Sequence, residues 1–337
     1  MSAVTLKEIA EVAGVSIATA SRALTVPERV AVSTRERIEA IAADLGYRPS
    51  KVARRLRSRG GATHILGVLI PDIQNPFFAE VIRGVEAVAH EAGYSVLFHN
   101  VDESVERQRA AVDALRTERV DGVILPPVRE HDADVDALIE DGIPVVCVDR
   151  RMTRSAVDTV VANSEQGARD GVALLIEQGH RRIGFIGGAP TLSTSRERLA
   201  GYRRAHDEVD LLIDPALLAE ANGRMEGGQA AAEALLSLED RPTALFTANN
   251  LMTLGALAAT HQRGLRIPED LALVGYDDMP WAMALNPPLT AVRQPGEEMG
   301  RRAAELLLAR IEEPDRSPSL VVLQPSLVVR RSCGSGS

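Results

Sequence analysis

Short apolar runs that alternate with helical patterns constrain the fold of most of this 337-residue chain. The first run, His64–Ile70, precedes a helical pattern over Phe77–Ala92. Apolar strands that alternate with helices are typical of parallel sheets covered on both faces. Two successive blocks of this kind predict an α/β core of two similar lobes, each with a doubly wound parallel sheet. The further runs of strand length are Ser95–His99, Val120–Leu125, Pro144–Val148, Arg182–Ile186, Ala244–Thr247 and Leu271–Gly275.

The N-terminal residues carry a different pattern, which predicts a small all-α headpiece with a helix-turn-helix. Thr5 and Glu8 have capping-box spacing, so a first helix is expected to begin directly after Thr5. Gly14 supplies the sharp turn, and Ser16 is suited to cap a second helix over Ile17–Leu24. The N-terminal part of such a second helix enters the major groove of DNA. The side chains expected to point outward from it are Ile17, Ala18, Ser21 and Arg22.

A third helix and the distribution of charge strengthen the interpretation as a DNA-binding module. Ser33 and Glu36 repeat the capping-box spacing, and the helix is expected to reach Leu45 before Gly46 stops it. Residues 1–61 carry 11 Lys/Arg against 6 Asp/Glu, whereas the remaining residues carry 27 against 41. An ordinary helical hairpin is the alternative. A basic end on an acidic chain instead indicates phosphate binding.

The basic segment Ser50–Arg59 is a candidate hinge. It is short and holds five Lys/Arg, so a helix there is marginal in isolation. We expect it to be disordered alone and to become helical when it pairs with its dimer mate on DNA. Leu56 is the one large apolar side chain in it that could act as a minor-groove wedge. A flexible basic linker is the alternative.

Polar and aromatic residues follow the predicted strands, at the sheet edge where such folds bind ligands. The carboxylates of Asp149 and Asp277 would accept hydrogen bonds from hydroxyl groups, and Arg198 would donate to oxygens. Two carboxylates in one cleft disfavour an anion unless one of them is paired with arginine, so the chemistry favours a neutral polyol or sugar. Helix capping and chain turning are the alternative for any one of these residues. The set comprises Asp72, Asn75, Phe77, Phe78, Asp149, Arg150, Thr194, Arg196, Arg198, Asn249, Asn250, Asp277 and Asp278.

Signatures of an enzyme or of a metal site are weak. Residues Gly184–Gly188 do not spell a dinucleotide-binding fingerprint, and no Walker-type phosphate loop occurs. The seven histidines lack metal-ligand spacing. We therefore expect no enzyme activity and no cofactor. This argues against a Rossmann-type enzyme with an added helical domain.

Export signals and membrane spans are not expected either. The sequence has no apolar run long enough to cross a membrane, and its N-terminus lacks the apolar stretch of a signal peptide. The sequence has only two cysteines, and this low number argues against structural disulfides. These features predict a cytoplasmic protein, associated with the nucleoid when bound to DNA. Together with the basic headpiece, they oppose a sugar-binding protein that feeds a transporter.

Many segments together give the chain its resemblance to one family. The segment Thr5–Leu24, the stretch Val30–Arg48 and the run Val52–Leu56 carry the most specific pattern. Over nearly its whole length the chain resembles the LacI/GalR family of bacterial transcriptional regulators. The further matching segments are Asp72–Phe78, Arg119–Ile124, Gly179–Ile183, Arg198–Tyr202, Val274–Asp278 and Pro287–Pro295.

This resemblance implies a dimeric repressor that binds a pseudo-palindromic operator and a small-molecule effector. The implied parts are a helix-turn-helix domain at 1–49, a hinge at 50–61 and an effector-binding core at 62–337. The core would resemble periplasmic sugar-binding proteins. Its first lobe would hold about 62–161 plus 292–320, and its second about 162–291 plus 321–330. A sugar is the expected effector, and a nucleobase or nucleoside corepressor is the alternative.

The resemblance also assigns roles to residues. Bases would be read by Ile17, Ala18 and Arg22, and the hinge would contact DNA through Val52, Ala53 and Leu56. Phosphate and other DNA contacts would fall on Thr5, Ser16, Thr19, Ser21 and Thr34. Effector contacts would fall on Phe77, Phe78, Asp149, Thr194, Arg198, Asn249 and Asp277.

The chain departs from the family pattern at several positions, in the effector-binding core and in the DNA-binding domain. Many members carry an aromatic residue where this chain has Gly223, followed by Arg224. Either the effector has no stacking contact on that side, or Trp281 replaces the aromatic residue. Thr25 stands where Asn commonly ends the recognition helix. No apolar heptads follow Val329, so a tetramer built on a C-terminal coiled coil is not expected.

Overall fold

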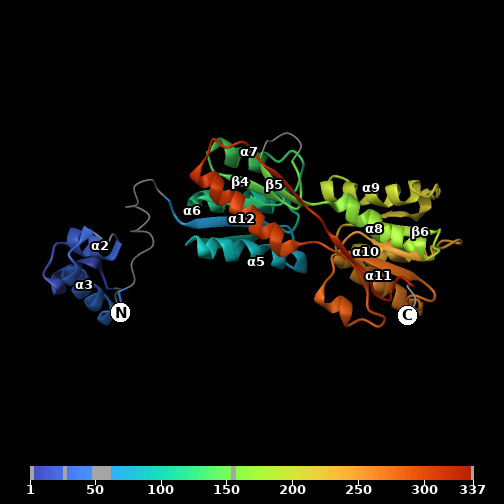
Figure 1. Ribbon diagram of the computed structural model, residues 1–337, viewed down its shortest axis with the longest axis horizontal. Helices are drawn as coiled ribbons and strands as arrows, with labels where there is room; N and C mark the ends of the chain where they lie inside the picture. The colour runs from blue at the N-terminus through green and yellow to red at the C-terminus, as the bar shows by residue number, and fades with distance from the viewer. Residues whose placement is uncertain (1–3, 26–28, 48–61, 153–156, 335–337) are drawn as a thin grey trace. The chain divides into compact units, whose positions relative to one another are not determined.

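The computed structural model describes residues 4–25, 29–47, 62–152 and 157–334. The chain divides into two units, Met1–Thr63 and His64–Ser337, whose elements are drawn in Figure 1.

The first unit contains the predicted helix-turn-helix. Its helices are α1 (Leu6–Ala13), α2 (Ile17–Thr25) and α3 (Val32–Asp44). The capping box of α1 is confirmed, because the Glu8 N–H donates to Thr5 Oγ1 and the Thr5 N–H donates to the Glu8 carboxylate at 2.6 Å. Gly14 ends α1 in the left-handed region with φ 62°. Ser16 Oγ accepts the Thr19 N–H at 3.1 Å, which confirms the cap of α2.

A small core joins these helices, although α3 differs from the prediction. Helix α3 begins at Val32, and no side chain caps its N-terminus. The predicted Ser33–Glu36 capping box is wrong because the Glu36 N–H already lies inside the helix. Leu45 is the C-cap of the helix, just before the left-handed Gly46, and is 39% exposed. The buried residues of this core are Ile9, Ala10, Ala13, Ala20, Ala23, Ile38 and Ala42.

The second unit holds two six-stranded sheets, one in each lobe, as predicted. In the first lobe the strand order is β11-β5-β4-β3-β1-β2, and every pair is parallel. In the second lobe the order is β12-β10-β9-β8-β6-β7, and only the edge pair of β10 and β12 is antiparallel. The strands are β1 (Ile65–Ile70), β2 (Ser95–Asn100), β3 (Gly122–Leu125), β4 (Val145–Val148), β5 (Asp158–Ala162), β6 (Ile183–Gly187), β7 (Leu218–Glu220), β8 (Ala244–Thr247), β9 (Ala272–Tyr276), β10 (Thr290–Arg293), β11 (Leu320–Leu323) and β12 (Ser326–Val328).

Helices cover both faces of each sheet. In β1, Val68 and Leu69 point to opposite faces and therefore enter different cores. The first core includes side chains of α5 and α12, and the second includes side chains of α6 and α7. The helices of this lobe are α5 (Pro76–Glu91), α6 (Val105–Glu118), α7 (Ala133–Glu140) and α12 (Gly296–Glu312). Those of the other lobe are α8 (Ser164–Glu177), α9 (Ser193–Asp207), α10 (Met225–Leu236) and α11 (Asn250–Gln262), with short 3-10 helices η2 (Pro215–Leu217) and η3 (Pro280–Met283).

The chain passes between the lobes after β5, β10 and β11. The expected assignment of 321–330 to the second lobe is wrong for β11, because Val321–Leu323 pair with β5 in the first lobe. Residues 292 and 293 belong to β10 of the second lobe rather than to the first. β11 and β12 are similar short runs separated by two residues, and each extends the edge of a different sheet.

Membrane insertion by a helix has no support in this fold. Among the residues that the structure describes, no helix is long and apolar enough to span a bilayer.

Candidate functional site

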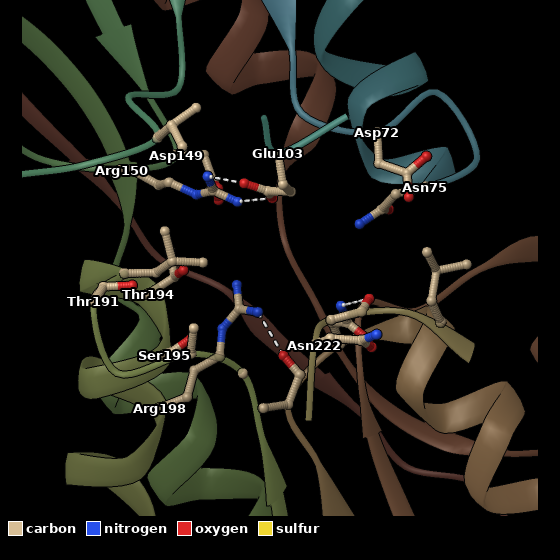
Figure 2. Close-up of a pocket in the computed structure, with 18 of the residues that line it drawn as sticks. Asp72, Asn75, Glu103, Asp149, Arg150, Thr191, Thr194, Ser195, Arg198 and Asn222 are labelled. Atoms are coloured by element: carbon tan, nitrogen blue, oxygen red, sulfur yellow. Dashed lines mark hydrogen bonds and ion pairs between the residues drawn. The ribbon is translucent and has the colours of Figure 1, made fainter. Parts of the chain in front are cut away.

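A cavity of about 660 Å³ lies between the two lobes, at the edge where their parallel strands end (Figure 2). The first lobe contributes Asp72 after β1, Glu103 after β2, and Asp149 and Arg150 after β4. The second lobe contributes residues of α9 and of the loops after β7, β8 and β9. Because each lobe supplies one wall, a ligand here would contact both.

Most of the residues expected to bind an effector meet in this cavity. The exceptions are Trp281, Asn250 and Asp278, which do not line it. Trp281 lies in η3 and packs against the cores of both lobes, so its proposed stacking role is wrong. The residues that do line the cavity are Phe77, Phe78, Asp149, Thr194, Arg198, Asn249 and Asp277.

The first turn of α5 forms an apolar wall. Phe77 and Phe78 pack edge to face with ring centroids 5.0 Å apart, and they are only 3% and 4% exposed. Asn75 fixes the start of the helix, because its Oδ1 accepts the Phe77 N–H at 3.0 Å, and Pro76 suits the first helical position. A ring face at this wall can cover the apolar face of a sugar.

Buried charges of the first lobe surround Asp149. Arg150 donates to the Glu103 carboxylate through both terminal nitrogens, and its Nε lies 3.6 Å from Asp149. Burial raises the pKa of Asp149 to about 6, against the lowering effect of Arg150 and Arg198. Asp149 therefore remains a hydrogen-bond acceptor at neutral pH without a strong ion pair of its own.

In the second lobe, Arg198 and Asp277 form the matching pair of donor and acceptor. The Arg198 guanidinium lies 3.8 Å from the centre of the Tyr276 ring, and Nη1 donates to the Ala248 carbonyl at 2.6 Å. Its buried Nε has no hydrogen-bond partner among the described residues. Burial raises the pKa of Asp277, while Arg198 and a 2.7 Å hydrogen bond from Gln294 oppose the shift. Arg198 can thus donate to a ligand oxygen, and Asp277 can accept from a ligand hydroxyl.

The two carboxylates occupy equivalent backbone positions in the two lobes. Asp149 follows β4 with φ 68°, and Asp277 follows β9 with φ 70°. Non-glycine residues seldom adopt this left-handed conformation, although Asp tolerates it better than most. Such strain is often kept where a side chain must be aimed at a ligand.

Asn249 has less freedom to bind a ligand than the sequence suggests. Its Oδ1 accepts the Met252 N–H at 2.7 Å and caps α11, while its Nδ2 donates to the Gly223 carbonyl at 2.8 Å. One amide hydrogen is left for a ligand. Asn249 therefore supports the wall of the cavity as much as it lines it.

Several lining residues were missed from the sequence. Glu103 follows β2 and could have been found by applying the strand-end rule to that strand as well. Gln294 follows β10, which was not predicted as a strand, so no signal marked it. Arg224 reaches Asp102 of the first lobe at 2.7 Å, so an ion pair between the lobes occupies the region where the family pattern has an aromatic residue. Other lining residues that were missed include Arg129, Glu130, His131, Thr191, Ser195, Asn222 and Met252.

The charges of the cavity favour an uncharged ligand. Arg150 pairs with Glu103, and Arg196 pairs with Glu130 across the lobes. No strong excess of either sign remains to attract an ion. The lining carboxylates are Asp72, Glu103, Glu130, Asp149 and Asp277, and the guanidinium groups are those of Arg129, Arg150, Arg196, Arg198 and Arg224.

A second candidate surface lies on α2 in the N-terminal unit. Ile17 is 50% exposed, and Ala18 and Arg22 are also exposed, as predicted for side chains that read DNA. The Ser16 and Thr19 hydroxyl groups lie 2.9 Å apart on the same turn. Ser21 and Thr34 are half-buried, and Thr5 is engaged in the cap of α1.

Other residues predicted to contact DNA cannot be placed. The hinge residues Val52, Ala53 and Leu56 lie outside the described residues, as does the side chain of Thr25.

Comparisons with known proteins match both units. Residues 5–50 match the model for bacterial regulatory proteins of the lacI family, and residues 172–333 match a periplasmic binding protein-like domain. The ribose operon repressor of Haemophilus influenzae is 36% identical over 97% of this chain and 98% of its own length. The transcriptional repressor PurR of Photobacterium profundum is 33% identical with the same two coverages. A crystal structure of the lac repressor dimer, bound to operator and the anti-inducer ONPF, superposes with a TM-score of 0.87 and 29% identity, over 98% of this chain and 99% of that one.

Proposed function

The chain belongs to the lacI family of bacterial regulatory proteins, and from this premise we propose that a neutral sugar in the cavity sets its affinity for an operator. It is a DNA-binding transcriptional regulator and not an enzyme. The observation that carries the proposal is the meeting of hydroxyl acceptors, a buried arginine donor and an aromatic wall in one cavity between the lobes.

Ribose is the sugar that we propose to test first. The full-length relative at 36% identity is named for the ribose operon. A pentose offers several hydroxyl groups that can donate to Asp149 and Asp277 and accept from Arg198. Its less polar ring face suits the phenyl wall of Phe77 and Phe78.

A nucleobase corepressor is the second candidate. Repressors named PurR resemble this chain about as closely as the ribose operon repressor does. A planar base needs a stacking surface, and both phenyl rings of the cavity come from a single turn of α5. The position that carries an aromatic residue in many family members is Gly223 here. We infer that one aromatic wall suits a sugar better than a purine.

For the DNA-bound state we propose a homodimer on a pseudo-palindromic site. The lac repressor neighbour is a dimer bound to its operator. Each protomer would place α2 in the major groove, with Ile17, Ala18 and Arg22 at base edges. Leu56 of the hinge would wedge into the minor groove, with Val52 and Ala53 as further DNA contacts. We propose that the regulator acts in the cytoplasm and associates with the nucleoid when it is bound to DNA.

Ligand binding to the full-length protein separates the two effector classes. Ribose is expected to raise the unfolding temperature in a concentration-dependent way, and hypoxanthine or guanine is expected to leave it unchanged. Arg198→Ala should abolish the ribose effect, whereas Arg204→Ala, an exposed change on the same helix, should preserve it. Stabilisation by the purine alone would reject the sugar in favour of the corepressor.

A further inference from the structure

A buried amide, that of Asn250, connects the two lobes beside the cavity. Asn250 begins α11 and is 1% exposed. Its Nδ2 donates to Oδ1 of Asn75 in the first lobe at 2.7 Å, and to Oδ2 of Asp277 in the second lobe at 3.3 Å. Asn250 itself does not line the cavity, whereas both of its acceptors do (Figure 2 shows Asn75 at the cavity wall).

The chemistry of these neighbours fixes the orientation of the amide. Asn75 Oδ1 also accepts the Phe77 N–H, so it is an oxygen, and Asp277 offers only carboxylate oxygens while it is ionised. The Asn250 atom that faces them must therefore be the NH₂ group, with one hydrogen for each acceptor. Its Oδ1 has no hydrogen-bond partner among the described residues.

Each acceptor belongs to a different part of the binding machinery. Asn75 caps α5, the helix that carries the aromatic wall of the first lobe. Asp277 is the hydrogen-bond acceptor of the second lobe. Its other carboxylate oxygen, Oδ1, accepts a 2.7 Å hydrogen bond from Gln294. One side chain thus connects a ligand-facing carboxylate of one lobe to the helix cap of the other.

We propose that Asn250 is a positioning residue that holds the lobes closed around the cavity and aims Asp277 at the effector. This inference rests on the proposed function only for the identity of the ligand. Without the amide, the open arrangement gains population. A ligand that contacts both walls then binds more weakly, because its apparent affinity falls in proportion to the population of the closed form.

Two substitutions and one control variant test this role. Asn250→Ala removes both side-chain hydrogen bonds and leaves only the backbone N–H of Asn250 to donate to Asp277. Asn250→Asp keeps the size of the side chain but places a carboxylate against Asp277 and Asn75 Oδ1. Glu197→Gln is the matched control, because it removes a different contact between the lobes, the 3.3 Å pair with Arg151, outside the cavity lining.

The direct readout is the separation of the lobes in the full-length protein without ligand. Fluorophores on Glu140→Cys and Glu239→Cys, exposed positions on different lobes, report that distance, and the native Cys147 and Cys333 are buried. Labelled protein is mixed with an excess of unlabelled chain, so that each dimer carries at most one labelled protomer and energy transfer occurs only within it. We expect both Asn250 variants to shift the distribution to longer distances and to weaken ribose binding at least tenfold, while Glu197→Gln matches the parent.

The outcomes separate the inference from the proposed function. Distance distributions of both Asn250 variants that superpose on the parent's would overturn the inference, even if the unfolding temperature falls, because a purely structural role predicts only that fall. If the parent itself binds no ribose, the sugar proposal fails, and the ligand-free distances still decide the role of Asn250.

Discussion

At the scale of single residues, the cavity keeps groups that are unfavourable until a ligand binds. Asp149 is 7% exposed, has φ 68° and lacks a close ion pair, although Arg150 lies nearby. Burial of a charge without a full complement of hydrogen bonds opposes folding. A sugar hydroxyl would supply the missing donor. Stability and effector binding therefore make opposite demands on this side chain.

We predict that Asp149→Asn stabilises the effector-free protein while it weakens sugar binding. Asn tolerates the left-handed backbone and removes the buried charge, and Arg150 keeps its pair with Glu103. The free energy of unfolding at pH 7.5 should rise by about 1–2 kcal/mol, measured by urea titration. Ribose affinity, measured by calorimetry, should fall at least tenfold. A destabilised variant with normal affinity would show that Asp149 has a structural role only.

The raised pKa of Asp149 also predicts a pH dependence of stability. The folded protein binds this proton with a pKa of about 6, above the ordinary aspartate value of 3.8. The group therefore contributes stability that is fully present below about pH 4 and is lost as the pH rises through 6. As the pH rises through this window, the unfolding free energy of the parent should fall relative to that of Asp149→Asn. A difference that is flat from pH 4 to pH 7 would contradict the raised pKa.

The limits of sequence reasoning at this scale are shown by particular residues. Asp149 and Asp277 could be predicted because they directly follow apolar strands. Gln294 could not, because it becomes important only through its hydrogen bond to Asp277. Trp281 was misplaced because a lone aromatic residue gives no sign of whether it faces a cavity or two apolar cores.

At the scale of elements, the aromatic wall depends on how closely α5 packs against α12. A Cβ atom on Gly300 would lie 2.0 Å from the Val81 carbonyl oxygen, and one on Gly84 would lie 2.0 Å from the Glu297 carbonyl oxygen. The two backbones therefore touch at two points. Because α5 also carries Phe77 and Phe78, this packing fixes where the wall stands.

We predict that Gly300→Ala destabilises the core and misplaces the wall. The added methyl group must push α12 away from α5, which should lower the free energy of unfolding by about 1–3 kcal/mol in a urea titration. Ribose binding should weaken in parallel. Glu305→Ala, an exposed change on the same helix, should stay within about 0.5 kcal/mol of the parent. Equal stability of the two variants would mean that the helices can separate without penalty.

Most strands were predictable from their apolar runs, whereas β5, β7, β10, β11 and β12 were not. β1 and β4 hold no polar side chain, and only Thr247 interrupts β8, so the sequence alone marks them. β7 has three residues, and β11 pairs with β5 across about 160 residues of chain. Their places depend on partners distant in sequence, which no local pattern encodes.

At the scale of the whole molecule, charge divides the chain by task. Residues 1–61 have a net charge of +5 and the rest have −14, so affinity for phosphates is concentrated at the N-terminal end. The sequence predicts this division of labour because it depends on residue type and not on contacts.

The most direct test of the central claim is the operator affinity of the full-length protein with and without saturating ribose. The operator is first selected from random DNA by the ligand-free protein, and binding is then followed by fluorescence anisotropy at fixed salt. We predict that ribose changes the Kd for the operator at least fivefold in the parent and leaves it unchanged in Arg198→Ala. An unchanged Kd in the parent, with ribose shown to be bound, would contradict control of DNA binding from this cavity.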